Sequence, residues 1–122
     1  MTLTHQSNPN SELAAEIQRR LSNANNYYRW IYQEFEAELG SEILEIGCGG
    51  GHFTRLLAAR RGKLVVADIE AHYLDAVNKE HAGRPNFSTT QIDLTAVNWS
   101  SLHSDKYDTV VFLNVLDRKS VV

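Results

Sequence analysis

The segment EILEIGCGGGHFT, residues 42–54, most constrains the fold, because an apolar run gives way at once to four glycines. Short apolar runs bounded by glycine are typical of buried strands in a parallel sheet. Glycine leaves the backbone bare, and a helix that starts there presents unpaired N–H groups to a ligand. The segment therefore predicts a ligand-binding bend between a first strand and a crossover helix.

Strand and helix patterns alternate after this bend. The apolar spacing predicts helices over 51–62 and 71–83, and further strands over 63–69, 87–94 and 107–116. Such alternation predicts an α/β fold, with right-handed crossovers and a Rossmann-like parallel sheet that has helices on both sides. The connection over 95–106 has little periodicity.

The N-terminal part has a different pattern. Residues 1–10 are polar and are predicted to be disordered. Apolar residues recur every four positions on either side of SNANN, residues 22–26, which predicts two helices separated by that break. We therefore expect a helical cap over 11–40 in front of the sheet.

Composition limits the class of protein. The chain has 122 residues and a formal net charge of -3, which fits one domain and argues against a nucleic-acid partner. The single cysteine, Cys48, excludes an internal disulfide and favours a reducing, cytoplasmic location. No apolar run is long enough for a membrane span, and the five histidines lack the spacing of a metal site.

The spacing of the glycines narrows the choice of ligand. A dinucleotide fingerprint needs its third glycine at the position of His52, and a phosphate-binding P-loop needs a Gly-Lys-Ser/Thr sequence that the segment lacks. The segment has instead the pattern E-x-G-x-G-x-G, beginning at Glu45. This pattern favours a ligand that is not a polyphosphate.

One acidic residue stands at or near the end of each of the first three predicted strands. Asp68 is placed to accept both hydroxyl protons of a ribose. Asp93 is placed to accept from an adenine amine, and Glu45 to hold an amino-acid ammonium directly or through water. Together these acids fit a nucleoside joined to an amino acid.

With these motifs the chain resembles the class I S-adenosylmethionine-dependent methyltransferases. The resemblance is carried by ILEIGCGGG, VVADIE, TQIDL and KYDTVVFLNVL, in the family's order, over residues 42–116. It implies that the cofactor is S-adenosylmethionine and that the reaction is methyl transfer. The cofactor-binding residues that it implies are Glu45, Gly47, Cys48, Gly49, Gly51, Asp68, Ile69, Asp93, Leu94 and Asn114. The catalytic residue and the acceptor stay open, with a small molecule, lipid or sugar favoured as acceptor.

The family's sheet has seven strands, and residues 41–116 supply the first four, as a partial domain. Residues 117–122, DRKSVV, match the translated opening bases of a common sequencing adapter and are predicted to be a non-native tail. Without a fifth strand, the fourth would expose an apolar edge, so the fragment is expected to self-associate and to be inactive alone.

Other interpretations stay open. Asp68 and Asp93 are also common turn residues, Cys48 suits packing better than nucleophilic attack, and Asp108 suits a structural role before the last strand. The alternative function is a non-catalytic nucleoside-binding module. A nicotinamide-dependent oxidoreductase is disfavoured by His52.

Overall fold

The computed structural model describes residues 9–96 and 106–113. A long helix, α1 (Pro9–Phe35), is followed by a 3-10 turn, η1 (Glu36–Glu38). Strands and helices then alternate: β1 (Glu42–Ile46), α2 (His52–Ala58), β2 (Lys63–Asp68), α3 (Ala71–Glu80), β3 (Phe87–Gln91) and β4 (Thr109–Phe112). Asn114 and the predicted tail over 117–122 lie outside the described residues.

The four strands form one parallel sheet in the order β3-β2-β1-β4. This arrangement confirms the predicted Rossmann-like α/β class. The chain runs outward from β1 through β2 to β3 and then crosses back to the other side of β1. Strand order therefore reverses between β1 and β4, and open α/β sheets generally bind their ligands at the carboxyl ends of the strands beside such a reversal.

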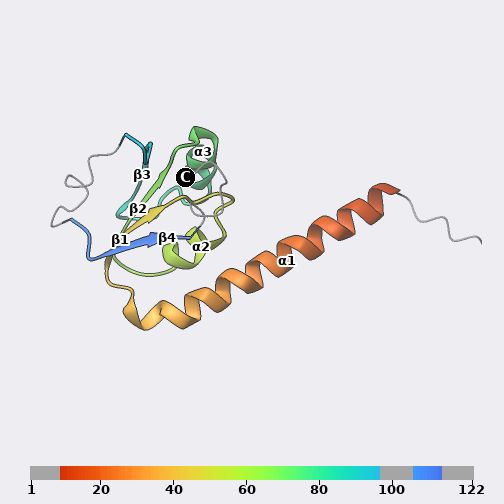
Figure 1. Cartoon of the computed structure of the whole chain (residues 1–122), viewed down its shortest axis with the longest axis horizontal. Helices are drawn as coiled ribbons and strands as arrows, with labels where there is room; N and C mark the ends of the chain where they lie inside the picture. The colour runs from red at the N-terminus through yellow and green to blue at the C-terminus, as the bar shows by residue number, and fades with distance from the viewer. Residues whose placement is uncertain (1–8, 97–105, 114–122) are drawn as a thin grey trace, which may run out of the picture.

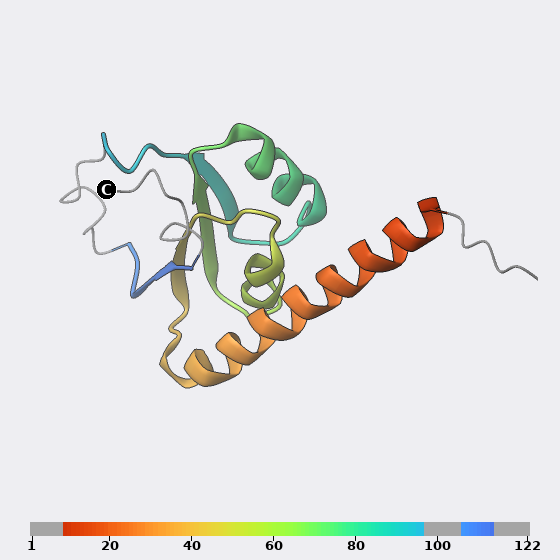
Figure 2. The same cartoon turned by 45° about the vertical axis from the view of Figure 1, so that its right-hand side comes forward.

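All three described α-helices lie on the same face of the sheet (Figure 2), so the predicted helices on the other side are not seen among the described residues. Alternation along the strands places Ile43 and Val66 on this face, where they join Phe53 and Leu57 of α2 in the main core. The opposite face is lined by a second set of apolar strand residues. Among the described residues, Ile92, Leu94 and Tyr107 pack against that set.

Residues 9–35 form one continuous helix, so the prediction of two helices was wrong. Residues 22–26 lack glycine and proline, and each Asn or Ser costs at most about 0.7 kcal/mol in a helix. The apolar stripe also continues through this segment, with Ala24 between Leu21 and Tyr28. The helix begins at Pro9, a residue suited to the first turn, so the predicted disordered tail was also wrong at its last two residues.

Asp108 ties the start of β4 to the start of β1. Its carboxylate accepts hydrogen bonds from the backbone N–H groups of Ser41, at 3.0 Å, and Glu42, at 3.2–3.3 Å. The predicted structural role of Asp108 is thereby confirmed. An open hollow of about 520 Å³ lies at this amino-terminal edge of the sheet, away from the acidic residues at the carboxyl edge.

Candidate functional site

The glycine segment forms a tight bend between β1 and α2. Gly47, Gly49 and Gly51 have φ angles of 84°, 50° and 83°, in the left-handed region that favours glycine. The N–H of Gly51 donates to the Cys48 carbonyl at 2.9 Å, which closes the turn. The bend therefore needs glycine for its backbone conformation, and it presents little side-chain bulk at the carboxyl edge.

Asp68 holds this bend from the neighbouring strand. Its side chain is almost fully buried, and its Oδ2 accepts from the Gly49 N–H at 3.3 Å and from the Cys48 thiol at 3.6 Å. Its Oδ1 accepts from the backbone N–H of Glu70 at 2.9 Å. A carboxylate has about four acceptor positions, so these contacts leave Asp68 with about one for another donor.

Glu45 is the most unusual acid in the structure. It lies on the central strand β1 with no solvent exposure, and its Oε1 accepts from the hydroxyl of Thr54 on α2 at 2.5 Å. The other carboxyl oxygen, Oε2, is buried and has no hydrogen-bond partner among residues 9–96 and 106–113. Burial raises the pKa of Glu45 to about 7, against the opposing hydrogen bond from Thr54. A buried carboxylate with one unmatched oxygen favours a cationic or hydrogen-bond-donating ligand.

Cys48 lies beside both acids but is not suited to nucleophilic chemistry. Its side chain is buried, and burial together with the negative charges of Asp68 and Glu45 raises the thiol pKa to about 12. Since the thiolate is the reactive form, this thiol is inert at neutral pH. The interpretation of Cys48 as a packing residue agrees with this environment.

Among the described residues, the side chain of Asp93, the third acidic residue, bonds to Thr95 and not to the glycine bend. Asp93 is exposed, and its Oδ1 accepts from the backbone N–H and the hydroxyl of Thr95 at 2.9 and 2.7 Å. These hydrogen bonds lower the pKa of Asp93. Ile69, next to Asp68, is 46% exposed, whereas Leu94 packs against the second core cluster. The structure thus brings Glu45 and Asp68 together beside the glycine bend, whereas Asp93 is exposed to solvent and bonded to Thr95.

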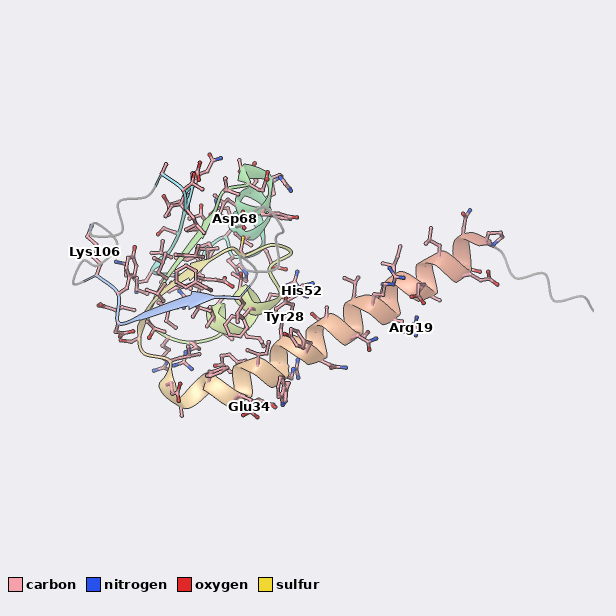
Figure 3. All side chains as sticks on the ribbon, viewed as in Figure 1. Arg19, Tyr28, Glu34, His52, Asp68 and Lys106 are labelled. Atoms are coloured by element: carbon pink, nitrogen blue, oxygen red, sulfur yellow. The ribbon has the colours of Figure 1, made fainter. Side chains whose placement is uncertain are left out.

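Sequence reasoning did not identify a contact between α1 and the start of α2. His52 Nδ1 lies 2.7 Å from the Asn25 side-chain oxygen, which is a hydrogen-bonding distance. The His52 ring also stacks on Tyr28, with ring centroids 5.5 Å apart, and both side chains meet where the helices cross (Figure 3). Burial and the charge of Arg55 lower the pKa of His52. This contact joins α1 directly to the end of the glycine bend.

Thr54 is the second residue that sequence reasoning missed. It is fully buried on α2, nine positions after the acid that it contacts. The available signal was its position one turn before the apolar residues Leu57 and Ala58 on the predicted helix. Within residues 9–96 and 106–113, no group of three His, Cys, Asp or Glu side chains could hold a metal ion.

A comparison with protein families assigns the domain. The family model described as a methyltransferase domain matches residues 44–120, which is more than half of the chain. The chain therefore belongs to the methyltransferase-domain family. In the part of the chain that the structure describes, no helix is both long and apolar enough to cross a membrane.

Several curated proteins are similar in sequence. Ubiquinone biosynthesis O-methyltransferase from Actinobacillus pleuropneumoniae serotype 7 is 25% identical over 91 residues, covering 72% of this chain and 39% of that protein. The enzyme of the same name from Aeromonas salmonicida is 30% identical over 88 residues, covering 72% of this chain and 37% of that protein. The chain thus spans about two fifths of the length of these relatives.

Solved structures show the same fold. Magnesium protoporphyrin IX methyltransferase from Synechocystis PCC 6803, solved with bound SAH, has a TM-score of 0.59 at 21% identity. The match covers 76% of this chain and 43% of that protein. A TehB-like SAM-dependent methyltransferase from Corynebacterium glutamicum has a TM-score of 0.56 at 23% identity, covering 88% of this chain and 56% of its own. At these identities the likeness shows the fold alone.

Proposed function

We propose that the carboxyl edge of β1 and β2 binds S-adenosylmethionine and that the domain serves methyl transfer to a small-molecule acceptor. The observation that carries the proposal is the buried Oε2 of Glu45, which has no hydrogen-bond partner in the described part of the chain and lies beside a bend with little side-chain bulk. A ligand with a cationic group would satisfy that oxygen and stabilise the ionised carboxylate. The methyltransferase-domain family and the neighbour solved with bound SAH support the choice of ligand.

Each part of such a ligand has a candidate partner. The amino-acid ammonium would lie near Glu45, directly or through water, and the ribose hydroxyls would donate to Asp68. Asp68 has about one acceptor position left, so full ribose binding requires it to release the weak contact with the Cys48 thiol.

The adenine would lie against Ile69 and Leu94, with Asp93 at its amine. Gly47, Cys48, Gly49 and Gly51 would form the floor beneath the amino acid and ribose. Asn114, the remaining proposed contact, lies outside the described residues.

The cofactor supplies a methyl group already activated by its sulfonium. The chain's own contribution is therefore to bind and align, since no nucleophile of the protein is required. An acceptor that is a small molecule agrees with the relatives, which are named for ubiquinone biosynthesis. The net charge of -3 supports an acceptor other than nucleic acid. The single cysteine supports a cytoplasmic location.

Calorimetric titration with S-adenosylhomocysteine tests this proposal. We expect one binding site in the 122-residue chain, with affinity reduced at least tenfold by Glu45→Gln and by Asp68→Asn. Glu42→Gln is the matched control, because it makes the same change on the same strand at the opposite edge. Equal affinities for all four proteins would overturn the proposed site. Methyl transfer is then measured in a longer chain with labelled S-adenosylmethionine, and binding without transfer would favour a non-catalytic module.

We also propose that β4 mediates self-association of this chain. Among the described strands, β4 pairs only with β1, and its Val110 and Phe112 are 44% and 39% exposed. Edge strands with apolar side chains are templates for pairing with another chain. A Val110→Lys variant should reduce association measured by light scattering, and unchanged association would exclude this edge.

A further inference from the structure

The projecting half of α1 has an uncovered apolar face. The helix passes beyond the sheet and α2, and its N-terminal half extends away from the body (Figure 1). Leu13, Ile17 and Leu21 on this half are 60%, 48% and 43% exposed. Their spacing of four places them on the side of the helix that carries Tyr28 and Ile31, which pack into the main core. The uncovered stripe thus continues an established interface beyond the end of the body.

Charged residues beside the stripe are distributed unevenly along the helix. Glu12 and Glu16 lie in its first part, and Arg19 and Arg20 follow. Both arginines contact Glu16, at 2.6 and 2.9 Å, with their side chains largely in solvent. The two acids balance the two bases over residues 9–24. This balance argues against an anionic lipid surface, since helices that bind such surfaces are rich in Lys and Arg.

We propose that a second copy of this chain covers the stripe, with the two α1 helices antiparallel about a two-fold axis at Ile17. Leu13 of one copy then faces Leu21 of the other, and the two Ile17 side chains meet at the axis. The same arrangement brings the acidic part of each helix alongside the basic part of its mate, whereas a parallel pair would align like charges. This proposal does not depend on the proposed cofactor.

The length of the projection supports this register. In a pair centred on Ile17, residue 9 of one helix lies opposite residue 25 of the other. Asn25 is the residue that contacts His52 of α2. The α1 helix of the second copy would therefore cover the whole projecting segment, up to the point where α1 meets α2. A single helix pair of this length lies at the small end of specific interfaces. We therefore expect a dimer whose population depends on protein concentration.

Cysteine cross-linking of the full chain tests the register. Ile17→Cys should form a disulfide-linked dimer under mild oxidation, because its two copies meet at the axis. Leu13→Cys should not, since its two copies would lie roughly 12 Å apart along the helix axis, beyond the reach of a disulfide. A mixture of Leu13→Cys with Leu21→Cys should cross-link. The unsubstituted chain is the blank, because its only thiol, Cys48, is buried.

Sedimentation supplies the second measurement. Ile17→Lys should shift the chain to monomer, whereas Gln18→Lys adds the same charge outside the stripe and should leave the dimer intact. Cross-linking of Leu13→Cys with itself would overturn the antiparallel arrangement. A failure of both Ile17→Cys and the Leu13→Cys/Leu21→Cys mixture to cross-link would overturn the proposal and leave any association to another surface, such as β4.

Discussion

Glu45 should make the stability of this fold depend on pH in a way that one substitution removes. Burial raises its pKa from 4.5 to about 7, and each pKa unit corresponds to about 1.4 kcal/mol. Ionising Glu45 in the ligand-free fold therefore costs about 3 kcal/mol. The folded-state pKa of Glu45 is higher than its value in the unfolded chain, so the folded chain binds this proton more tightly. The resulting contribution to the free energy of unfolding is fully present below pH 4.5 and is lost as the pH rises through 7.

The assay is denaturant unfolding of the 122-residue chain and of Glu45→Gln at pH 5 and pH 8. The free energy of unfolding of the unsubstituted chain should fall by roughly 2–3 kcal/mol more than that of Glu45→Gln over this interval. The glutamine keeps an acceptor for the Thr54 hydroxyl and does not titrate. All other titrating groups are the same in the two proteins, so they contribute equally to the pH dependence of both. Equal pH dependence in both proteins would refute a buried, proton-binding Glu45.

Further expectations concern the framework around the site. Gly62→Ala should destabilise the fold by more than about 1 kcal/mol, because its φ is 107° and a Cβ would collide with the Ser41 carbonyl; unfolding curves measure this. Leu57→Ala should cost about 2–5 kcal/mol by the same assay, since the side chain is fully buried on α2. Asp108→Ala should lower the melting temperature more than Asp108→Asn, which keeps an acceptor oxygen for the backbone at the start of β1. Cys48 should react with an aromatic disulfide reagent far more slowly in the native chain than in denaturant, and equal rates would contradict its burial.

The sheet was predictable because its signals are local and regular. The run from Glu42 to Ile46 and the near-continuous apolar run of β2 specify buried parallel strands, and the glycines specify the bend between β1 and α2. Acidic residues at strand ends are brought to one edge by parallel topology alone. The third strand ends earlier than predicted, at Gln91, although the N–H of Ile92 still donates to the Asp68 carbonyl.

Contacts between distant elements were not predictable from spacing. The break expected at residues 22–26 depended on the modest preference of Asn and Ser for caps, which a continuous helix with a packed C-terminal half overrides. The partnership of Glu45 with Thr54 depends on how α2 packs against β1. Nothing in the sequence showed that Asp68 would hold the bend through Gly49 while Asp93 turned to Thr95.

Amide chemical-shift mapping during titration with S-adenosylhomocysteine tests the proposed site most directly. We expect the largest shifts at the bend over 47–51, at Asp68 and Ile69, and at Asp93, all at the carboxyl edge of the sheet. Lys63 and Asn86, which line the hollow at the opposite edge, should be unchanged. Shifts confined to that hollow, or no shifts in a folded chain, would contradict the assignment of this edge as the cofactor site.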